Sequence, residues 1–389
     1  MAASAHALLG PSSSHRWLNC TPSARLEEHV VDKGSDFAQE GSCAHALCEE
    51  KLYLLLGDAD MAEEARKEQI KNNRDRWYNA EMENATDDYV TEVWNHYQDA
   101  LKATPDAKLF IERRLDFTKW IPESFGTADA VIICDGTMEV IDFKYGKGVE
   151  VSAVGNTQMM IYALGALNEF GMEYDIKHVR MTIIQPRMSN FSDYDISAEE
   201  LQGWGENVLK PTAQKAWDGE GEQSAGEWCR FCKIKATCAK LANQAVAAYT
   251  QNENKESISD EAFPDILKLI PAIKSWCTAV EDYALAKAIG GHEFNGFKVV
   301  EGRSIRKVTD PNELYARLVA EGYEPADIYK PAELKAVGEL EKLTGKAKFA
   351  TLAKGCIDKP QGKPTLVPNT DKRAPMKVNS AADDFANVP

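Results

Sequence analysis

The sequence predicts a mixed α+β (α/β) domain in which a sheet carries a helix on its face. Three strand-like runs stand in succession at 108–116, 127–134 and 138–144. A mostly apolar helix is expected over about 154–170, and a further β-rich run, 178–185, follows it. Such a strand–helix–strand crossover favours parallel pairing of the two flanking strands, with the helix packed against the sheet.

The other predicted elements are mainly helical. A helix over 39–56 ends at the stop signal Gly57-Asp58, and 86–103 carries apolar residues at helical spacing. The second and third strands are separated by Asp135-Gly136, a strong signal for a two-residue hairpin. After the fourth strand, residues 195–245 are expected to be mainly helical.

A polar stretch at 250–257 predicts a linker between two parts of the chain. We therefore expect a first domain over 1–250 and a mostly helical C-terminal extension over 258–370, which has no motif that indicates a role. The last residues, 377–389, are expected to be disordered.

Composition limits the possible classes of protein. The chain has 389 residues, 44% of them hydrophobic, and a net charge of −16. It shows no apolar run of membrane length and no signal sequence, so we expect a cytoplasmic protein that does not enter a membrane. The negative charge argues against coating nucleic acid by bulk electrostatics. Local basic patches exist, with ordinary solvated helix faces as the alternative: Arg66, Lys67, Lys71, Arg74 and Arg76, and Arg230, Lys233, Lys235 and Lys240.

The predicted hairpin brings two carboxylates together. A two-residue turn at Asp135-Gly136 pairs Cys134 with Thr137 and, five residues back from Cys134, Asp129 with Asp142. Cross-strand Cβ atoms lie about 4.5–5.5 Å apart, which is close enough for both side chains to bind one hard cation such as Mg²⁺. The alternative is an ordinary hairpin with solvated charges.

Lys144 is expected beside this cation. Because side chains alternate along a strand, Asp142 and Lys144 project from one face while Phe143 turns to the other. An ammonium there can orient an attacking water and stabilise charge on a phosphate, while the metal acts as Lewis acid. The chemistry indicated is phosphodiester hydrolysis.

Motifs on two helices add to this set. His45, in Gly41-Ser-Cys-Ala-His45, can supply an imidazole nitrogen to the same metal. Gln158 and Tyr162 lie four residues apart on one face of the later helix. Ordinary packing is the alternative for each of these residues.

In this order, the motifs resemble the RecB-like branch of the PD-(D/E)XK nucleases, over roughly residues 10–245. The matching pieces are the Gly-x-x-x-His helix, Gly126-Thr-Ala-Asp129, Asp142-Phe-Lys144 and Gln158-x-x-x-Tyr162. The resemblance implies an αβββαβ restriction-endonuclease-like core. It also implies a Mg²⁺ or Mn²⁺ site made by His45, Asp129, Asp142 and the backbone carbonyl of Phe143, with Gln158 and Tyr162 orienting the active site or DNA. Ala128 in place of proline and Asp142 in place of glutamate are its two departures from the name pattern.

Cysteine spacing indicates a second metal centre. Cys229, Cys232 and Cys238 form a Cys-x2-Cys-x5-Cys triplet that lacks a fourth ligand, and Cys20 lies far upstream. This arrangement resembles the iron–sulfur nucleases of the AddB and CRISPR-adaptation type, in which one N-terminal cysteine joins a C-terminal triplet. Four thiolates suit a [4Fe–4S] cluster and equally a structural Zn²⁺; the resemblance favours iron–sulfur.

The residues that flank these cysteines have two possible roles. Arg16, Trp17, Arg230 and Phe231 can contact DNA by charge and stacking, with packing around the cluster as the alternative. A centre joining residue 20 to residues 229–238 would hold the two ends of the first domain together. The other five cysteines lack ligand spacing and read as small buried hydrophobes or free thiols.

As a whole, the chain resembles an uncharacterised family of phage and prophage proteins that carry this nuclease core. The resemblance implies a deoxyribonuclease, an exonuclease in preference to an endonuclease, that acts on single-stranded DNA or free ends in replication or recombination. A phage single-strand-binding or annealing protein is a further expected partner. Two alternatives stay open: a DNA-binding or assembly protein that keeps the fold but does not cut, and a zinc-stabilised regulator.

Overall fold

The computed structural model describes residues 7–30, 34–250, 260, 263–300, 315–316, 319–320 and 348. The chain divides into two compact units, Met1–Val300 and Glu301–Pro389. All the elements described below belong to the first unit. Most of the predicted linker, the later part of the C-terminal extension and the predicted disordered tail lie outside the described residues.

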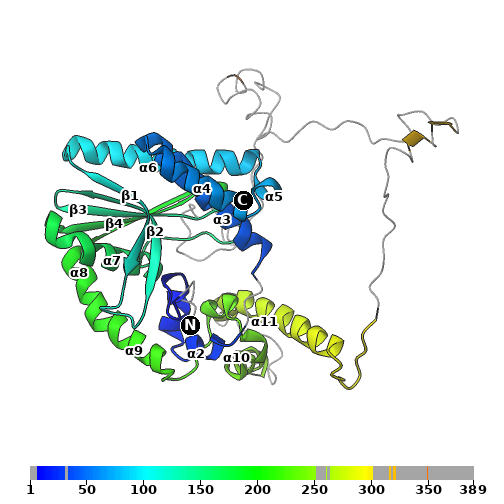
Figure 1. The fold of residues 1–389 in the computed structure, drawn as a ribbon. Coiled ribbons are helices and arrows are strands. Elements are labelled where there is room, and N and C mark those ends of the chain that lie inside the picture. Colours follow the sequence, from blue (N-terminus) through cyan, green and yellow to red (C-terminus); the bar gives the residue numbers. More distant parts are fainter. Residues whose placement is uncertain are drawn as a thin grey trace, which may run out of the picture. The chain divides into compact units, whose positions relative to one another are not determined.

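A five-stranded sheet forms the centre of the first unit (Figure 1). Its order is β1-β2-β3-β4-β5; β3 and β4 are parallel and the other neighbours are antiparallel. The predicted mixed α+β class and the parallel crossover are therefore confirmed. The strands are β1 (Lys108–Asp116), β2 (Phe125–Cys134), β3 (Thr137–Phe143), β4 (His178–Gln185) and β5 (Asn190–Ser197).

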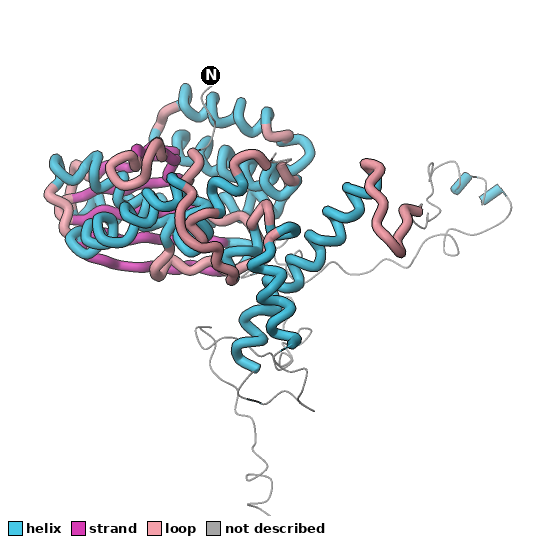
Figure 2. Tube along the Cα trace, turned by 90° about the horizontal axis from the view of Figure 1, so that it is seen from below, coloured by secondary structure: helices cyan, strands magenta, loops and turns pink. Residues whose placement is uncertain are grey.

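Helices surround the sheet, as Figure 2 shows. The long helices α3 (Asp36–Leu56) and α6 (Ala80–Ala103) contact one face, and α7 (Thr157–Tyr174) contacts the other. The remaining helices are α1 (Ser14–Asn19), α2 (Ser23–Glu27), α4 (Ala59–Lys71), α5 (Arg74–Trp77), α8 (Ala198–Trp204), α9 (Lys210–Asp218), α10 (Ala239–Thr250) and α11 (Phe263–Ile289), with short turns η1 (Pro11–Ser13), η2 (Pro186–Met188), η3 (Gly205–Leu209), η4 (Glu227–Phe231) and η5 (Lys235–Thr237).

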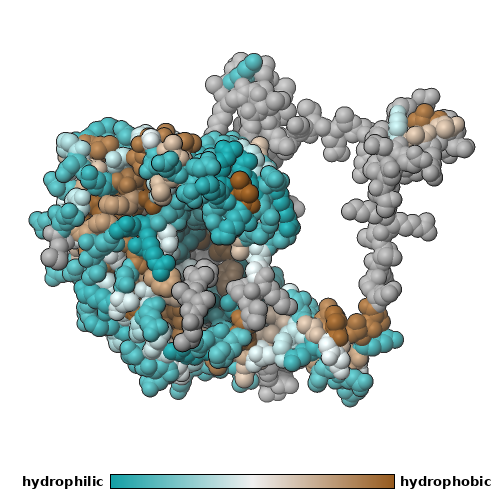
Figure 3. All heavy atoms as spheres, viewed as in Figure 1, coloured by the Kyte–Doolittle hydropathy of each residue, from teal (hydrophilic) through white to brown (hydrophobic). Residues whose placement is uncertain are grey.

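Two hydrophobic clusters fill the layers on either side of the sheet. Val131 and Val140 point into the cluster that includes α7, while Ile132 and Ile141 point into the cluster that includes α3 and α6. This alternation is the normal consequence of strand geometry, and it places apolar residues of the central strands on both faces of the sheet. Every described helix is either too short or too polar to cross a bilayer. The face of the first unit seen in Figure 3 is mainly hydrophilic.

The strand β5 was not predicted, because its buried positions are polar. Asn190 and Ser192 are buried while Phe191 is exposed, which inverts the usual pattern of an amphipathic strand. Both buried side chains bind the segment that follows β3: Asn190 Nδ2 donates to the Val151 carbonyl (2.8 Å), and Ser192 Oγ accepts the Ala153 N–H (3.0 Å). This strand thus fixes the chain between Lys144 and α7.

Close packing of α7 on β1 depends on Gly165. A Cβ built at Gly165 would lie 2.4 Å and 2.8 Å from ring atoms of Phe117, which is itself fully buried. We expect Gly165→Ala to lower the free energy of unfolding by about 2–3 kcal/mol, measured by urea titration, because the ring has no space into which to move. The control is Gly203→Ala in α8, where nothing lies within 4 Å; equal stability of the two variants would contradict this account of the packing.

Candidate metal and nuclease site

The β2–β3 hairpin has the predicted register as far as the paired residues extend. Pairs run from Cys134 with Thr137 to Ala130 with Ile141. Beyond these pairs, the Phe143 N–H of β3 donates to a side chain of β2, Asp129 Oδ2, at 2.7 Å. Asp129 therefore lies at the end of the β2–β3 ladder, next to Phe143, where the two strands separate.

The side-chain alternation of β2 breaks at Asp129. Ala128 packs in the α7 cluster and Ala130 in the α3–α6 cluster, although residues two apart share a face in a regular strand. On the neighbouring strand β1, Glu112 has a φ of 46°. The backbone of β1 is therefore irregular at the position opposite Asp129. The irregularity directs the Asp129 carboxylate toward α3.

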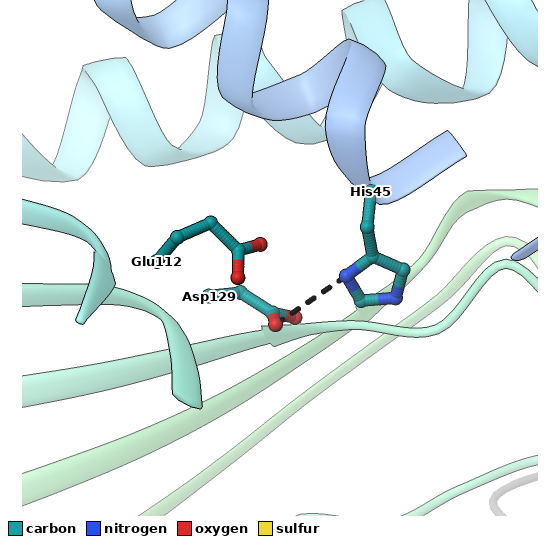
Figure 4. Close-up of side chains that lie close together, drawn as sticks. All are labelled: His45, Glu112 and Asp129. Atoms are coloured by element: carbon teal, nitrogen blue, oxygen red, sulfur yellow. Dashed lines mark ion pairs between the residues drawn. The ribbon is translucent and has the colours of Figure 1, made fainter. Parts of the chain in front are cut away.

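Three potential metal ligands gather there (Figure 4): His45 from α3, Glu112 from β1 and Asp129 from β2. Their ligand atoms all lie within 4.8 Å of one another, and His45 Nδ1 is 3.3 Å from Asp129 Oδ1. Two of the predicted ligands, His45 and Asp129, are thus brought together. Asp142 is not a member of this donor group, and Glu112 is a member that the sequence did not predict.

The electrostatics of the donor group reflect its surplus of negative charge. Burial alone would lower the pKa of His45, but Asp129, supported by Glu112, raises it to about 9. Burial and the Asp129 charge raise the pKa of Glu112 to about 8. Burial opposes ionisation of Asp129 as well, yet His45 and the Phe143 N–H hold its pKa below the ordinary value. A divalent cation would neutralise both carboxylates, so an imidazole and two carboxylates fit one here.

On the α7 side, Asp142 and Lys144 form a second polar group. Lys144 Nζ lies 2.9 Å from Asp142 Oδ2 and donates to Gln158 Oε1 at 3.0 Å. Gln158 Nε2 donates in turn to Asp142 Oδ1 (3.2 Å) and to the Tyr162 hydroxyl (3.4 Å). The four predicted residues Asp142, Lys144, Gln158 and Tyr162 therefore form one hydrogen-bonded network.

Charge in this network is fixed by the pairing of Lys144 with Asp142. Burial alone would lower the pKa of Lys144, but the Asp142 carboxylate raises it above the ordinary value. Burial also raises the pKa of the Tyr162 hydroxyl, which stays protonated. The side chain of Lys144 is 26% exposed and that of Asp142 only 5%. The Lys144 side chain is therefore partly exposed, while its carboxylate partner is buried.

The start of α7 positions Gln158. The N-cap residue Asn156 accepts the backbone N–H groups of Gln158 and Met159, which fixes the first turn. Thr157 Oγ1 lies 2.6 Å from Ser14 Oγ of α1, so the N-terminal segment supports the same turn. The network thus rests on segments far apart in the sequence.

The predicted cluster cysteines lie near one another: Cys229 is in η4, and Cys20, Cys232 and Cys238 directly follow α1, η4 and η5. The backbone N–H of Ser224 donates to Cys20 Sγ (3.5 Å), and the Ser224 carbonyl lies 4.0 Å from Cys229 Sγ. Burial raises the pKa of the Cys229 thiol; the Gly226 N–H opposes this, and Cys238 and Cys20 raise the pKa further. Ser224 thus links Cys20, which lies far upstream in the sequence, to Cys229 of the triplet.

Two features of the cysteine group bear on which metal it suits. Cys20 and Cys229 sulfurs each accept a backbone N–H, as sulfurs that bind iron–sulfur clusters commonly do. Among the described residues, no three of these sulfurs lie within 4.8 Å of one another. The four cysteines suit a [4Fe–4S] cluster and a structural Zn²⁺ alike.

The two ends of this region are also joined by protein contacts. Arg25 Nε donates to the Trp217 carbonyl at 2.6 Å, and the Lys233 N–H donates to the buried Glu27 carboxylate at 2.5 Å. Burial, and next the nearby Glu27, raise the pKa of the Cys232 thiol to about 12. Metal binding by the cysteines would therefore strengthen a contact between α2 and residues 217–233 that the protein already makes.

The family comparison covers nearly the whole sequence. Residues 6–374 match the family described as "Protein of unknown function (DUF2800)". The chain belongs to the DUF2800 family. It is also similar to a solved structure titled "Crystal structure of SSO0001", with 14% identity and a TM-score of 0.23, over 57% of this chain and 95% of that one. So slight a likeness says nothing of function.

The DNA contacts suggested for α1 need correction in this DUF2800 protein. Trp17 is fully buried and its indole N–H donates to the Gly10 carbonyl, so the ring cannot stack on a base. Arg16 pairs with the buried carboxylate of Glu27 at 2.7 Å. Both residues therefore fit the packing alternative, because α1 packs into the core. Phe231 is 73% exposed, with Arg230 above its ring at 5.5 Å, so these two stay candidates.

The first basic patch is largely neutralised in this DUF2800 protein. Four of its five cations pair with carboxylates: Arg66 with Glu50, Lys67 with Glu64, Lys71 with Glu68, and Arg76 with Asp36. The fifth, Arg74, donates to Gln69 and covers the Tyr78 ring. The patch therefore fits the solvated-face alternative better than a phosphate-binding surface.

Proposed function

We propose that this DUF2800 protein is a metal-dependent deoxyribonuclease with a RecB-like PD-(D/E)XK core. The observation that carries the proposal is the placement of two groups at one end of β3. The metal donors His45 and Asp129 lie on the α3 side of Phe143. The ammonium of Lys144, held by Asp142 and Gln158, lies on the α7 side. A phosphodiester bound at this strand end would contact both.

The residues have separate tasks in this proposal. His45 and Asp129, with the Phe143 carbonyl, would hold Mg²⁺ or Mn²⁺, which supplies Lewis-acid activation of water and phosphate when bound. Asp142, which the sequence predicted as a further ligand, would hold the Lys144 ammonium. Lys144 stabilises negative charge on the phosphate, and its pairing with Asp142 keeps it protonated. Gln158 holds the Lys144 ammonium in place, and Tyr162 contacts Gln158. Because these positions are fixed before substrate arrives, little reorganisation is needed during the reaction.

The cysteine group would hold a [4Fe–4S] cluster through Cys20, Cys229, Cys232 and Cys238. The backbone N–H donors to the Cys20 and Cys229 sulfurs, together with the resemblance of the cysteine spacing to iron–sulfur nucleases, support this assignment. All eight described cysteines are unbridged, which suits the reducing cytoplasm. Protein purified without oxygen should be brown and contain iron; colourless protein containing zinc would overturn the cluster assignment.

The substrate would be DNA, either single-stranded or with free ends, in phage or prophage replication or recombination. Arg230 and Phe231 offer an exposed cation and ring for binding such a strand. A single-strand-binding or annealing protein is the expected partner.

Digestion of DNA labelled at one end tests the function. Full-length protein is incubated with single- or double-stranded DNA in Mn²⁺, in Mg²⁺ and in excess chelator. Cleavage that requires the cation supports the proposal, and the order in which labelled products appear gives the polarity. DNA that is bound in a gel-shift assay but never cut would support the non-cleaving alternative instead.

A further inference from the structure

A third potential metal ligand, Glu112, lies beside His45 and Asp129 on a strand that carries no recognised motif (Figure 4). We propose that Glu112 is a direct ligand of the catalytic cation, so that the α3-side site is a three-residue set of one imidazole and two carboxylates. The inference deepens the proposed function, on which it rests only for the identity of the cation as the catalytic one.

Geometry gives the first argument. The ligand atoms of Glu112, His45 and Asp129 come from β1, α3 and β2, and all lie within 4.8 Å of one another. Asp142 does not belong to this group, because its carboxylate is bound by Lys144 and Gln158. Glu112 therefore supplies the cation with a third protein ligand without disturbing the Lys144 network.

Backbone conformation gives a second, independent argument. Glu112 has a φ of 46° in the middle of a strand, a conformation that side chains other than glycine, asparagine and aspartate seldom adopt. Strain of this kind persists where the surroundings enforce it, and it is concentrated at functional sites. At Glu112 the unusual φ belongs to a residue whose carboxylate has an oxygen within 4.8 Å of a ligand atom of Asp129.

The wall of the cavity gives a third argument. His45, Glu112 and Asp129 line a cavity together with Tyr89 of α6. The Tyr89 side chain is 1% exposed, and its hydroxyl has no hydrogen-bond partner within the described part of the chain. A buried hydroxyl normally has a partner. A water or carboxylate oxygen on the cation would supply one, so Tyr89 is a positioning residue for the site.

The donor set also bears on the choice of cation. Mg²⁺ prefers oxygen ligands in octahedral geometry and retains several waters, whereas an imidazole suits transition metals. A site with one imidazole and two carboxylates should therefore bind Mn²⁺ more tightly than Mg²⁺.

Calorimetric titration of full-length protein with Mn²⁺ alone tests the inference. Glu112→Gln should weaken Mn²⁺ binding roughly 100-fold and Tyr89→Phe roughly tenfold, following the cost of altering ligands and their supports. The matched control is Glu63→Gln, an exposed carboxylate on α4 that does not line the cavity, and its affinity should change less than about threefold. Wild-type affinity in Glu112→Gln would overturn the inference.

Folding of the variants is checked by melting each one without metal. Should Glu112→Gln fail to fold, Glu112→Gly serves in its place, because glycine accepts the positive φ without strain. The two proposals fail separately. Mn²⁺ binding that depends on Glu112 in a protein that never cuts DNA would refute the nuclease and keep the ligand. DNA cleavage by Glu112→Gln with wild-type Mn²⁺ affinity would refute Glu112 as a ligand and keep the nuclease proposal.

Discussion

Lys144→Ala is expected to lower the rate of DNA cleavage by about 1000-fold at saturating Mn²⁺, since removal of one fixed group that stabilises transition-state charge has an effect of this size. The loss should appear in the turnover rate, because the cation donors His45 and Asp129 remain. Mn²⁺ affinity should therefore stay close to that of the wild type. Initial rates on end-labelled DNA provide the measurement.

Lys147→Ala is the matched control. Lys147 lies three residues further on, its side chain is 50% exposed, and it pairs with Glu81 away from Gln158. Loss of this surface cation should leave the cleavage rate within about twofold of the wild type, because exposed ion pairs contribute little. Equal rates in the Lys144 and Lys147 variants would mean that Lys144 has no special part in the reaction.

Cys232→Ser should lose the bound iron and lower the melting temperature by about 4 °C or more, which corresponds to a loss of roughly 3 kcal/mol in a chain of this size. Cys232 is 8% exposed, so nothing from solvent can replace its sulfur easily. Complete unfolding is not expected, because Arg25 and Glu27 already join α2 to residues 217–233. Iron content, visible absorbance and a melting curve measure the effect.

Cys277→Ser controls for the loss of a thiol as such. Cys277 lies on α11, is exposed and is outside the predicted ligand set. Its replacement should change stability by less than about 0.5 kcal/mol and leave the iron content unchanged. If Cys232→Ser retained its iron and its melting curve, the cysteine group would be ordinary packing.

The central hairpin was predictable because its register depends on a local turn. Two residues, Asp135 and Gly136, connect β2 to β3, so each later pair follows by counting. The same counting could not show that Asp129 departs from the regular pattern. That departure arises from packing against α3 and from the irregular backbone at Glu112, neither of which is local in sequence.

Glu112 shows why the rest of the site was not predictable. It is opposite Asp129 in the β1–β2 register, since Ile111 pairs with Ala130 and Arg113 with Ala128. However, the chain between β1 and β2 is long, and no tight turn fixes the pairing. A glutamate in an otherwise ordinary strand carries no signal of its own. The structure was needed to bring it next to His45.

The most direct test of the nuclease proposal compares the wild type with Asp142→Ala and Lys144→Ala in the digestion of end-labelled single- and double-stranded DNA with Mn²⁺. Melting curves confirm that each variant is folded. We expect the wild type to cut DNA only with the cation and both variants to lose nearly all activity. Undiminished cleavage by both variants would contradict the assignment of the active site.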